Sequence, residues 1–131
     1  MASHKTVLAN GVFDIFHIGH LRYLEAAARM GDVLVVSITR NAYVNKGPGS
    51  PLYDELERLR VVAALRCVSR AILVTGSRHA LEQVRPAIFV KGREYKGKIL
   101  AEDEEYCREH NIEIRFTDTE TMRPRDRLRQ G

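Results

Sequence analysis

Residues 6–20 read TVLANGVFDIFHIGH, and this stretch decides the fold. Residues 6–9 form a short apolar run that is typical of a β-strand buried on both faces. Asn10 and Gly11 are residue types that favour a turn, and apolar residues recur at helical spacing from Ile18 onward. The stretch therefore predicts a strand, a turn and a helix in succession, which is the first half of a parallel α/β unit.

The rest of the chain repeats this alternation of short apolar runs and helical segments. Further strands are predicted at residues 33–38, 71–74, 87–90 and 113–116. Helices are predicted at residues 18–28, along the apolar face of Leu52, Leu56, Leu59 and Ala63, and at residues 80–84 and 101–110, the last capped by Asn111. The sequence therefore predicts an α/β fold of Rossmann-like, three-layer type, in which a five-stranded, mostly parallel sheet is flanked by helices.

The composition is that of a globular domain with a basic surface. The 131 residues are 44% apolar and 29% charged, which suits one domain over residues 1–131, with a basic segment at 117–131 that can lead to a further domain. The net charge of +4 favours anionic partners. Five Tyr and four Phe are few for a nucleic-acid surface with interleaved aromatic rings, so we expect small phosphorylated partners and no nucleic acid.

Targeting and redox signals are sparse in this sequence. No apolar run approaches the roughly 18 residues of a membrane helix, and no apolar signal core follows the first residues. Cys67 and Cys107 belong to neither a CxxC motif nor a Cys/His cluster, so we expect reduced thiols and no zinc site. These features predict a cytoplasmic protein without a membrane partner.

The pair of histidines that ends the opening stretch is its most informative part. His17 and His20 are three residues apart, which places both imidazoles on one side of a helix start. Gly19 carries no side chain that would block a ligand from the helix N-terminus, where backbone N–H groups and the helix dipole favour phosphate. A single histidine or glycine is usually structural. The combination with Asp14 at one strand-to-helix junction favours a site for polyanions.

Residues 10–20 resemble the GxFDxxHxGH signature of the cytidylyltransferase-like nucleotidyltransferases. Residues 45–51 (NKGPGSP) are similar to the lysine loop of the sugar-phosphate nucleotidyltransferases. Residues 90–99 (VKGREYKGKI) resemble the V-x-G-D-D-W-x-G-K stretch of the glycerol-phosphate cytidylyltransferases, but an Arg-Glu pair replaces the paired aspartates. The Lys-Gly pair of the same stretch matches the heptose-phosphate adenylyltransferases. The resemblance therefore covers most of the chain, in the same order.

This resemblance implies a mechanism and three catalytic residues. An oxygen of the acceptor's phosphate or phosphonate attacks the α-phosphorus of a nucleoside triphosphate in line, and pyrophosphate leaves without a covalent enzyme intermediate. His17 and His20 are implied to hold the triphosphate and stabilise the transition state, and Lys46 to close over the phosphates as a point charge. Mg²⁺ is the implied cofactor, bound through phosphates and water rather than by protein side chains.

The resemblance also implies residues that bind the nucleotide. The family's final motif, RTEGISTT, is replaced here by TDTETMRP at residues 117–124, so either Thr121 and Arg123 contact phosphate in place of the missing hydroxyls or the segment is a basic tail. The implied nucleotide-binding residues are Gly11, Val12, Phe13, Gly19, Lys91, Gly92, Arg93, Glu94, Thr119, Thr121 and Arg123.

Three residues are assigned to the acceptor, each with an alternative. Asp14 is expected to orient the acceptor, a water shell or the neighbouring histidine. Arg58 is implied in the site by the resemblance, and its alternative is a surface pairing with Asp54 or Glu55. Tyr95 either stacks on the ligand or closes the core.

The functional interpretation is an enzyme that transfers CMP from CTP to a small phosphorylated or phosphonate alcohol. One form of it is the nucleotidyltransferase domain fused to a phosphoenolpyruvate mutase in phosphonate biosynthesis. The alternative is a heptose-phosphate adenylyltransferase that uses ATP, and a non-catalytic nucleotide sensor or a nucleic-acid-binding module are alternatives of another class. Family members commonly pair, so a homodimer is expected. Alanine at His17 or His20 is expected to lower turnover by orders of magnitude and to leave the fold intact, because neither lies in the apolar face.

Overall fold

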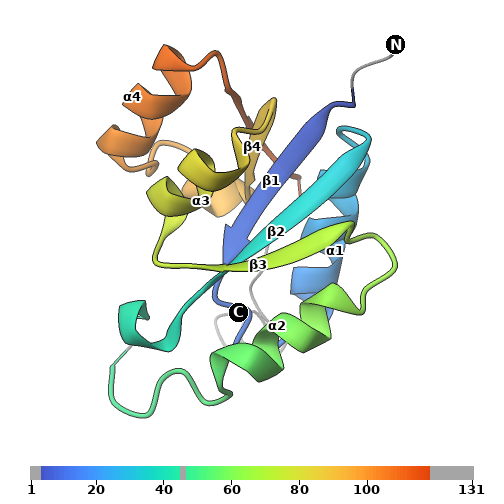
Figure 1. The fold of residues 1–131 in the computed structure, drawn as a ribbon, viewed down its shortest axis with the longest axis vertical. Helices are drawn as coiled ribbons and strands as arrows, with labels where there is room; N and C mark the ends of the chain where they lie inside the picture. The colour runs from blue at the N-terminus through green and yellow to red at the C-terminus, as the bar shows by residue number, and fades with distance from the viewer. Residues whose placement is uncertain (1–3, 45–46, 119–131) are drawn as a thin grey trace, which may run out of the picture.

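The computed structural model describes residues 4–44 and 47–118 and shows five parallel strands flanked by helices on both faces (Figure 1). The strands lie in the order β3-β2-β1-β4-β5, so the chain winds outward from β1 in both directions and the predicted α/β fold is confirmed. The elements are β1 (Thr6–Gly11), α1 (Ile18–Ala28), β2 (Val33–Thr39), η1 (Asn41–Tyr43), α2 (Glu55–Ala63), β3 (Arg70–Val74), α3 (Ser77–Val84), β4 (Ile88–Lys91), η2 (Arg93–Tyr95), α4 (Ala101–Glu109) and β5 (Glu113–Phe116).

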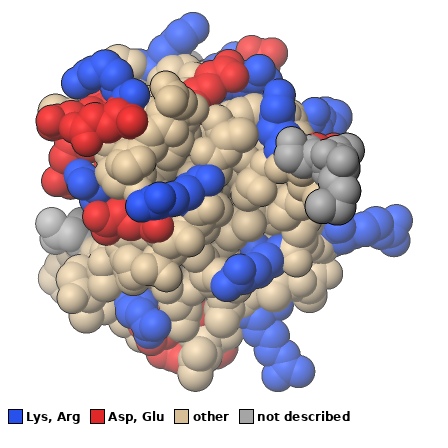
Figure 2. All heavy atoms as spheres, turned by 45° about the horizontal axis from the view of Figure 1, so that its top comes forward, with Lys and Arg blue, Asp and Glu red and all other residues tan. Residues whose placement is uncertain are grey.

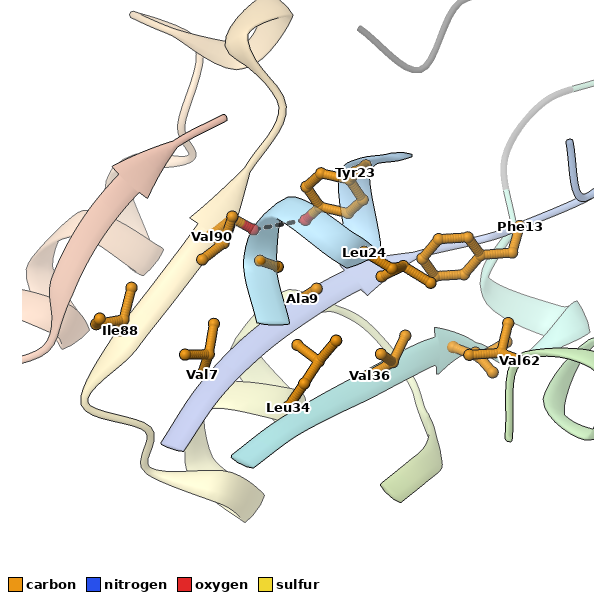
Figure 3. Packing of buried hydrophobic residues seen from close by; sticks show 12 residues of the cluster. Val7, Ala9, Phe13, Tyr23, Leu24, Leu34, Val36, Val62, Ile88 and Val90 are labelled. Carbon is orange, nitrogen blue, oxygen red and sulfur yellow. Dashed lines mark hydrogen bonds between the residues drawn. The ribbon is translucent and has the colours of Figure 1, made fainter. Parts of the chain in front are cut away.

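Two apolar cores lie on opposite faces of the sheet, because successive side chains of a strand point to opposite faces. Val7 and Ala9 of β1 pack in one core with Leu24 of α1 and Val62 of α2 (Figure 3). Leu8 packs in the other core, which α3 and α4 cover with Ala80, Leu81, Tyr106 and Cys107. All three β1 residues are fully buried, as the sequence pattern predicts for a central strand.

Several element boundaries differ from the sequence prediction. β1 continues for two residues beyond its predicted end, because Asn10 and Gly11 pair in register with Ser37 and Ile38 of β2. The turn that was expected at Asn10 and Gly11 therefore follows Gly11. At the other end of the chain, Asn111 has a φ of 56°, and the Ile112 N–H donates to the Cys107 carbonyl at 2.8 Å, which confirms the predicted cap of α4.

The predicted core face of α2 is wrong except at Leu59, which is partly buried against the core. The helix begins at Glu55, after Asp54 accepts a hydrogen bond from the Leu56 N–H, and its buried residues are Arg58 and Val62. Leu52 lies before the helix and is 63% exposed, and Leu56 is 62% exposed. The spacing of the apolar residues predicted the wrong side of the helix as buried. The helix instead turns a polar residue, Arg58, toward the protein interior.

The cysteines and the helix lengths complete the description. Cys67 and Cys107 are free thiols, and burial raises the pKa of Cys107 to about 11. Within residues 4–44 and 47–118, no helix has the length and apolar character needed to span a membrane. The same part of the chain contains no cluster of three or more His, Cys, Asp or Glu residues that could hold a metal ion.

Candidate functional site

The turn between β1 and α1 is held by an aromatic ring packed against a glycine. Phe13 has a φ of 56°, and its side chain is only 5% exposed. A Cβ atom on Gly11 would lie 2.9 Å from the Phe13 ring, so only glycine leaves room for this ring. The Phe13 ring in turn lies edge-on to the imidazole of His20, with ring centroids 5.3 Å apart. Gly11 and Phe13 therefore position His20.

The two histidines cap the first turn of α1. His17 is the N-cap residue, and its Nδ1 accepts from the Gly19 N–H at 3.1 Å, while His20 Nδ1 accepts from the His17 N–H at 3.2 Å. This reciprocal pair is a capping box built from imidazoles. Because each Nδ1 accepts a hydrogen bond, the neutral rings carry their hydrogen on Nε2 and can donate it to a phosphate oxygen.

These caps change what the sequence predicted for the helix N-terminus. Gly19 is buried, and its N–H, one of the backbone groups at the helix N-terminus, donates to the His17 ring. Alanine at His17 or His20 therefore removes a cap and should lower stability by about 1 kcal/mol, and the expectation that the fold stays intact remains a prediction.

A cavity of about 90 Å³ lies at the carboxyl ends of β1 and β4. It brings together residues that are far apart in the sequence, and most of them were predicted for the site. The lining residues are Asn10, Gly11, Val12, Phe13, His20, Tyr23, Lys91, Gly92 and Tyr95. Such a cavity at the carboxyl edge of a parallel sheet is where ligands of this fold class bind, and its size suits a phosphate group.

Two lining residues, Asn10 and Tyr23, were missed by the sequence analysis. The Tyr23 hydroxyl donates to the Val90 carbonyl at 2.6 Å (Figure 3), and burial raises the pKa of Tyr23 far above its ordinary value. Asn10 donates to the Ser37 hydroxyl at 2.7 Å. Tyr23 lies one helical turn after His20, and this spacing was the one feature of the sequence that could have placed it in the cavity wall. These neutral, anchored groups form part of the cavity wall.

Lys91 brings a positive charge to this cavity. Its Nζ lies 4.3 Å from the centroid of the Tyr95 ring and 5.7 Å from that of Phe89, so two aromatic rings hold the ammonium group. Burial lowers the pKa of Lys91, although the charges of Asp103 and Glu94 act in the opposite direction. A partly desolvated cation attracts an anion more strongly than a solvated one.

The neighbours of Lys91 take separate positions. Tyr95 is 44% exposed, so the alternative that it closes the core is wrong. A Cβ atom on Gly92 would displace the Glu94 carboxylate, which lies beside it. Neither Arg93 nor Glu94 lines the described cavity, and Arg93 is exposed.

Asp14 holds a loop. Its carboxylate oxygens accept hydrogen bonds from the backbone N–H groups of Leu52, at 2.6 Å, and Tyr53, at 2.9 Å. The three roles expected from the sequence, which were to orient the acceptor, a water shell or the neighbouring histidine, do not include this structural role. The observed contacts tie the turn after β1 to the segment that precedes α2.

Arg58 is a buried brace, 2% exposed, so its alternative as a surface arginine is wrong. Its guanidinium donates to the carbonyls of Val12, Thr39 and Tyr53, each at 2.9 Å, and to the Asn41 side chain at 2.7 Å. Burial lowers the pKa of Arg58, and nearby carboxylates partly offset this shift. Arg58 therefore connects the turn after β1, the end of β2 and the start of α2.

Some predicted residues are not placed by the structure. Lys46, Thr119, Thr121 and Arg123 lie outside the described residues. A larger cavity of about 680 Å³ lies along β2 and β3 and contains none of the predicted site residues. The site therefore rests on the cavity at the ends of β1 and β4 and on the histidine-capped start of α1.

The arrangement is suited to anion binding. It combines imidazole donors, a partly buried ammonium group and a helix N-terminus, which all favour negative charge. The groups can therefore hold and neutralise phosphates during transfer between two substrates.

Known proteins resemble the chain in sequence and in structure. Residues 8–124 match the family described as Cytidylyltransferase-like. The bifunctional protein HldE of Geobacter metallireducens is 40% identical over 95 residues, which cover 70% of this chain and 19% of that protein. The HldE protein of Streptomyces coelicolor is 41% identical over 106 residues, covering 77% of this chain and 23% of the relative. The chain thus spans about a fifth of the length of these relatives.

Solved structures extend the comparison. A lipopolysaccharide core biosynthesis protein of Thermoplasma volcanium superposes with a TM-score of 0.75 and 31% identity, over 89% of this chain and 98% of that one. Pantoate-β-alanine ligase of Francisella tularensis shares the fold, with a TM-score of 0.67 and 15% identity, over 92% of this chain and 61% of the ligase. The match over nearly all of the described fold, together with the sequence relatives, shows that the chain belongs to the cytidylyltransferase-like family of nucleotidyltransferases.

Proposed function

We propose that the chain transfers a nucleoside monophosphate from a nucleoside triphosphate to the phosphate of a small acceptor. The observation that carries this proposal is the cavity where His20 and Lys91 meet beside the capped start of α1. An acceptor phosphate oxygen forms a new bond to the α-phosphorus, and the bond from that phosphorus to the pyrophosphate oxygen breaks. Catalysis then consists of alignment and charge neutralisation.

Each charged group has a proposed task in this step. The Nε2–H groups of His17 and His20 donate to the triphosphate, whose charge shifts toward the leaving pyrophosphate. Lys91 attracts a phosphate as a point charge, and Lys46 is proposed to do the same from its loop. Mg²⁺ is proposed to arrive with the triphosphate rather than to be held by a carboxylate of the protein. Asp14 is the acidic residue nearest the histidines in sequence, and both of its carboxylate oxygens already accept backbone hydrogen bonds.

The relatives favour ATP and a sugar phosphate over the first expectation of CTP and a phospho-alcohol. The similar curated proteins are HldE proteins, which fits the heptose-phosphate adenylyltransferase alternative. The description of the Thermoplasma protein as a lipopolysaccharide core biosynthesis protein also supports a sugar acceptor. The phosphonate acceptor has no support among these relatives.

A pyrophosphate-release assay tests the substrate pair. With Mg²⁺ and a heptose 1-phosphate, ATP should release pyrophosphate at least ten times faster than CTP. Glycerol 3-phosphate and a hydroxyalkyl phosphonate are the control acceptors, and both should react slowly with either nucleotide. Faster release from CTP with one of the control acceptors would restore the first expectation. No release with any pair would favour the nucleotide sensor.

The nucleic-acid alternative gains no support from the surface shown in Figure 2. On that face, Lys and Arg side chains are scattered among uncharged residues, and acidic side chains lie between several of them. A continuous basic strip with interleaved aromatic rings is what single-stranded nucleic acid needs.

We also propose that the chain forms a homodimer through exposed apolar residues on α2 and in the segment just before it. Leu52, Leu56 and Val61 are 63%, 62% and 48% exposed, which is unusual for neighbouring large apolar residues. Sedimentation velocity at micromolar concentration should give the mass of two chains, and Leu56→Glu should give one. A wild-type chain that sediments as a monomer at all concentrations would rule out this dimer.

A further inference from the structure

A second cavity adjoins the first on the side of α3 and α4. It has a volume of about 270 Å³ and is lined in part by Ser77, Lys91, Tyr95, Lys98, Leu100 and Asp103. Lys91 and Tyr95 also line the cavity that contains His20. The two cavities therefore share a wall, and a molecule in the second cavity has Lys91 between it and the phosphate site.

Asp103 is a buried carboxylate with one oxygen left unpaired. It lies in the first turn of α4 and is 3% exposed. Its Oδ2 accepts a hydrogen bond from the Ser77 hydroxyl at 2.5 Å. Its Oδ1 is buried and has no hydrogen-bond partner among residues 4–44 and 47–118. A buried polar atom without a partner is costly and rare in native proteins, so Asp103 requires an explanation.

The lining of this cavity has the chemical features of a sugar site. Asp103 can only accept hydrogen bonds when it is ionised, and sugar hydroxyls are donors. Lys91 and Lys98 offer positive charge for a phosphate, and the Tyr95 ring and Leu100 offer apolar surface for the carbon face of a sugar. The terminal torsion of a carboxylate is soft, so the Asp103 carboxylate can adjust its orientation to a bound hydroxyl.

We propose that this second cavity, with Asp103 as its specificity-determining residue, binds the polyhydroxylated part of the acceptor. Hydroxyl groups of a sugar donate to Asp103, and the sugar's phosphate lies at Lys91, where it faces the nucleotide in the first cavity. This inference rests on the proposed function, because it assigns the acceptor side of the same reaction. Of the residues that the sequence analysis assigned to the acceptor, Tyr95 lines this cavity, whereas Asp14 and Arg58 do not.

Calorimetric titration with a heptose 1-phosphate, in the absence of nucleotide, tests the cavity without relying on turnover. Asp103→Asn keeps the shape and an acceptor for Ser77 but replaces an ionised oxygen with an amide. We expect its dissociation constant for the sugar phosphate to rise at least tenfold. Glu104→Gln is the matched control, since it removes an exposed acidic charge from the same helix turn and should change binding less than twofold.

Steady-state kinetics then separate the two substrates. Asp103→Asn should raise the KM for the sugar phosphate at least tenfold and leave the KM for ATP within twofold. Its preference for the heptose 1-phosphate over a deoxygenated analogue should also fall, because the carboxylate that recognises the missing hydroxyl is gone. If Asp103→Asn fails to fold, Ser77→Ala provides the second variant, with an expected rise of about threefold in the same dissociation constant.

The possible outcomes distinguish the subsite from the proposed function. Sugar-phosphate binding that is unchanged in Asp103→Asn and in Ser77→Ala overturns the subsite, even if pyrophosphate release is observed. A change confined to ATP binding also overturns it, since the cavity would then hold the nucleotide base. Calorimetric binding that depends on Asp103, without pyrophosphate release by the wild-type chain, supports the subsite and removes the proposed function.

Discussion

Replacing His20 with glutamine should lower the rate of pyrophosphate release by about 100- to 1,000-fold, and replacing His17 with asparagine should do the same. The expected loss is that of one preorganised donor to the charge that develops in the transition state. Both substitutions keep a helix cap, because asparagine is a good N-cap residue and glutamine completes a capping box three residues later. The measurement is turnover at saturating ATP and sugar phosphate.

Alanine variants at the same positions separate capping from catalysis. His17→Ala and His20→Ala remove the hydrogen bonds to the backbone N–H groups of Gly19 and His17, so each should lose about 1 kcal/mol of unfolding free energy. His17→Asn and His20→Gln should remain closer to the wild type in urea denaturation. Near-normal turnover in these two cap-retaining variants would show that the imidazoles serve only the helix.

Replacing Arg58 with methionine should lower the free energy of unfolding by about 3 kcal/mol or more. Methionine fills much of the same space but leaves the carbonyls of Val12, Thr39 and Tyr53 without their buried donor. Urea denaturation followed by circular dichroism measures the loss. Turnover should fall as well, because the Val12 carbonyl belongs to the turn that positions His20.

Arg60→Met is the matched control for this prediction. Arg60 lies on the same helix and is exposed, so its substitution should change the free energy of unfolding by less than about 0.5 kcal/mol. Equal stabilities for the Arg58 and Arg60 variants would contradict the assignment of Arg58 as a buried brace.

The parallel sheet and the histidine pair were accessible from the sequence because their signals are local. Each strand is a short apolar run, and β5 was predicted with its observed bounds, Glu113–Phe116. The spacing of His17 and His20 placed both rings at one helix start, where the structure shows them in reciprocal contact with the backbone. These patterns can be recognised in the sequence because the spacing of side chains on one face is set by the backbone geometry of a single helix or strand.

The roles of Arg58 and Tyr23 were not accessible, because their partners are distant in the sequence. The Tyr23 hydroxyl bonds to a carbonyl 67 residues away, and one of the Arg58 bonds spans 46 residues. Asp103 and Ser77, which are 26 residues apart, likewise gave no signal. Apolar counting also placed the wrong face of α2 toward the core, since it cannot recognise an arginine that is buried by hydrogen bonds to carbonyls.

The central claim is that the capped start of α1 and the cavity beside it hold the triphosphate. A crystal structure with a non-hydrolysable α,β-methylene analogue of ATP tests it most directly. The expected result is density for the α-phosphate within hydrogen-bonding distance of His20 Nε2, with Lys91 beside a phosphate. Density along β2 and β3, in the cavity of about 680 Å³, or no density at saturating analogue, would contradict the account.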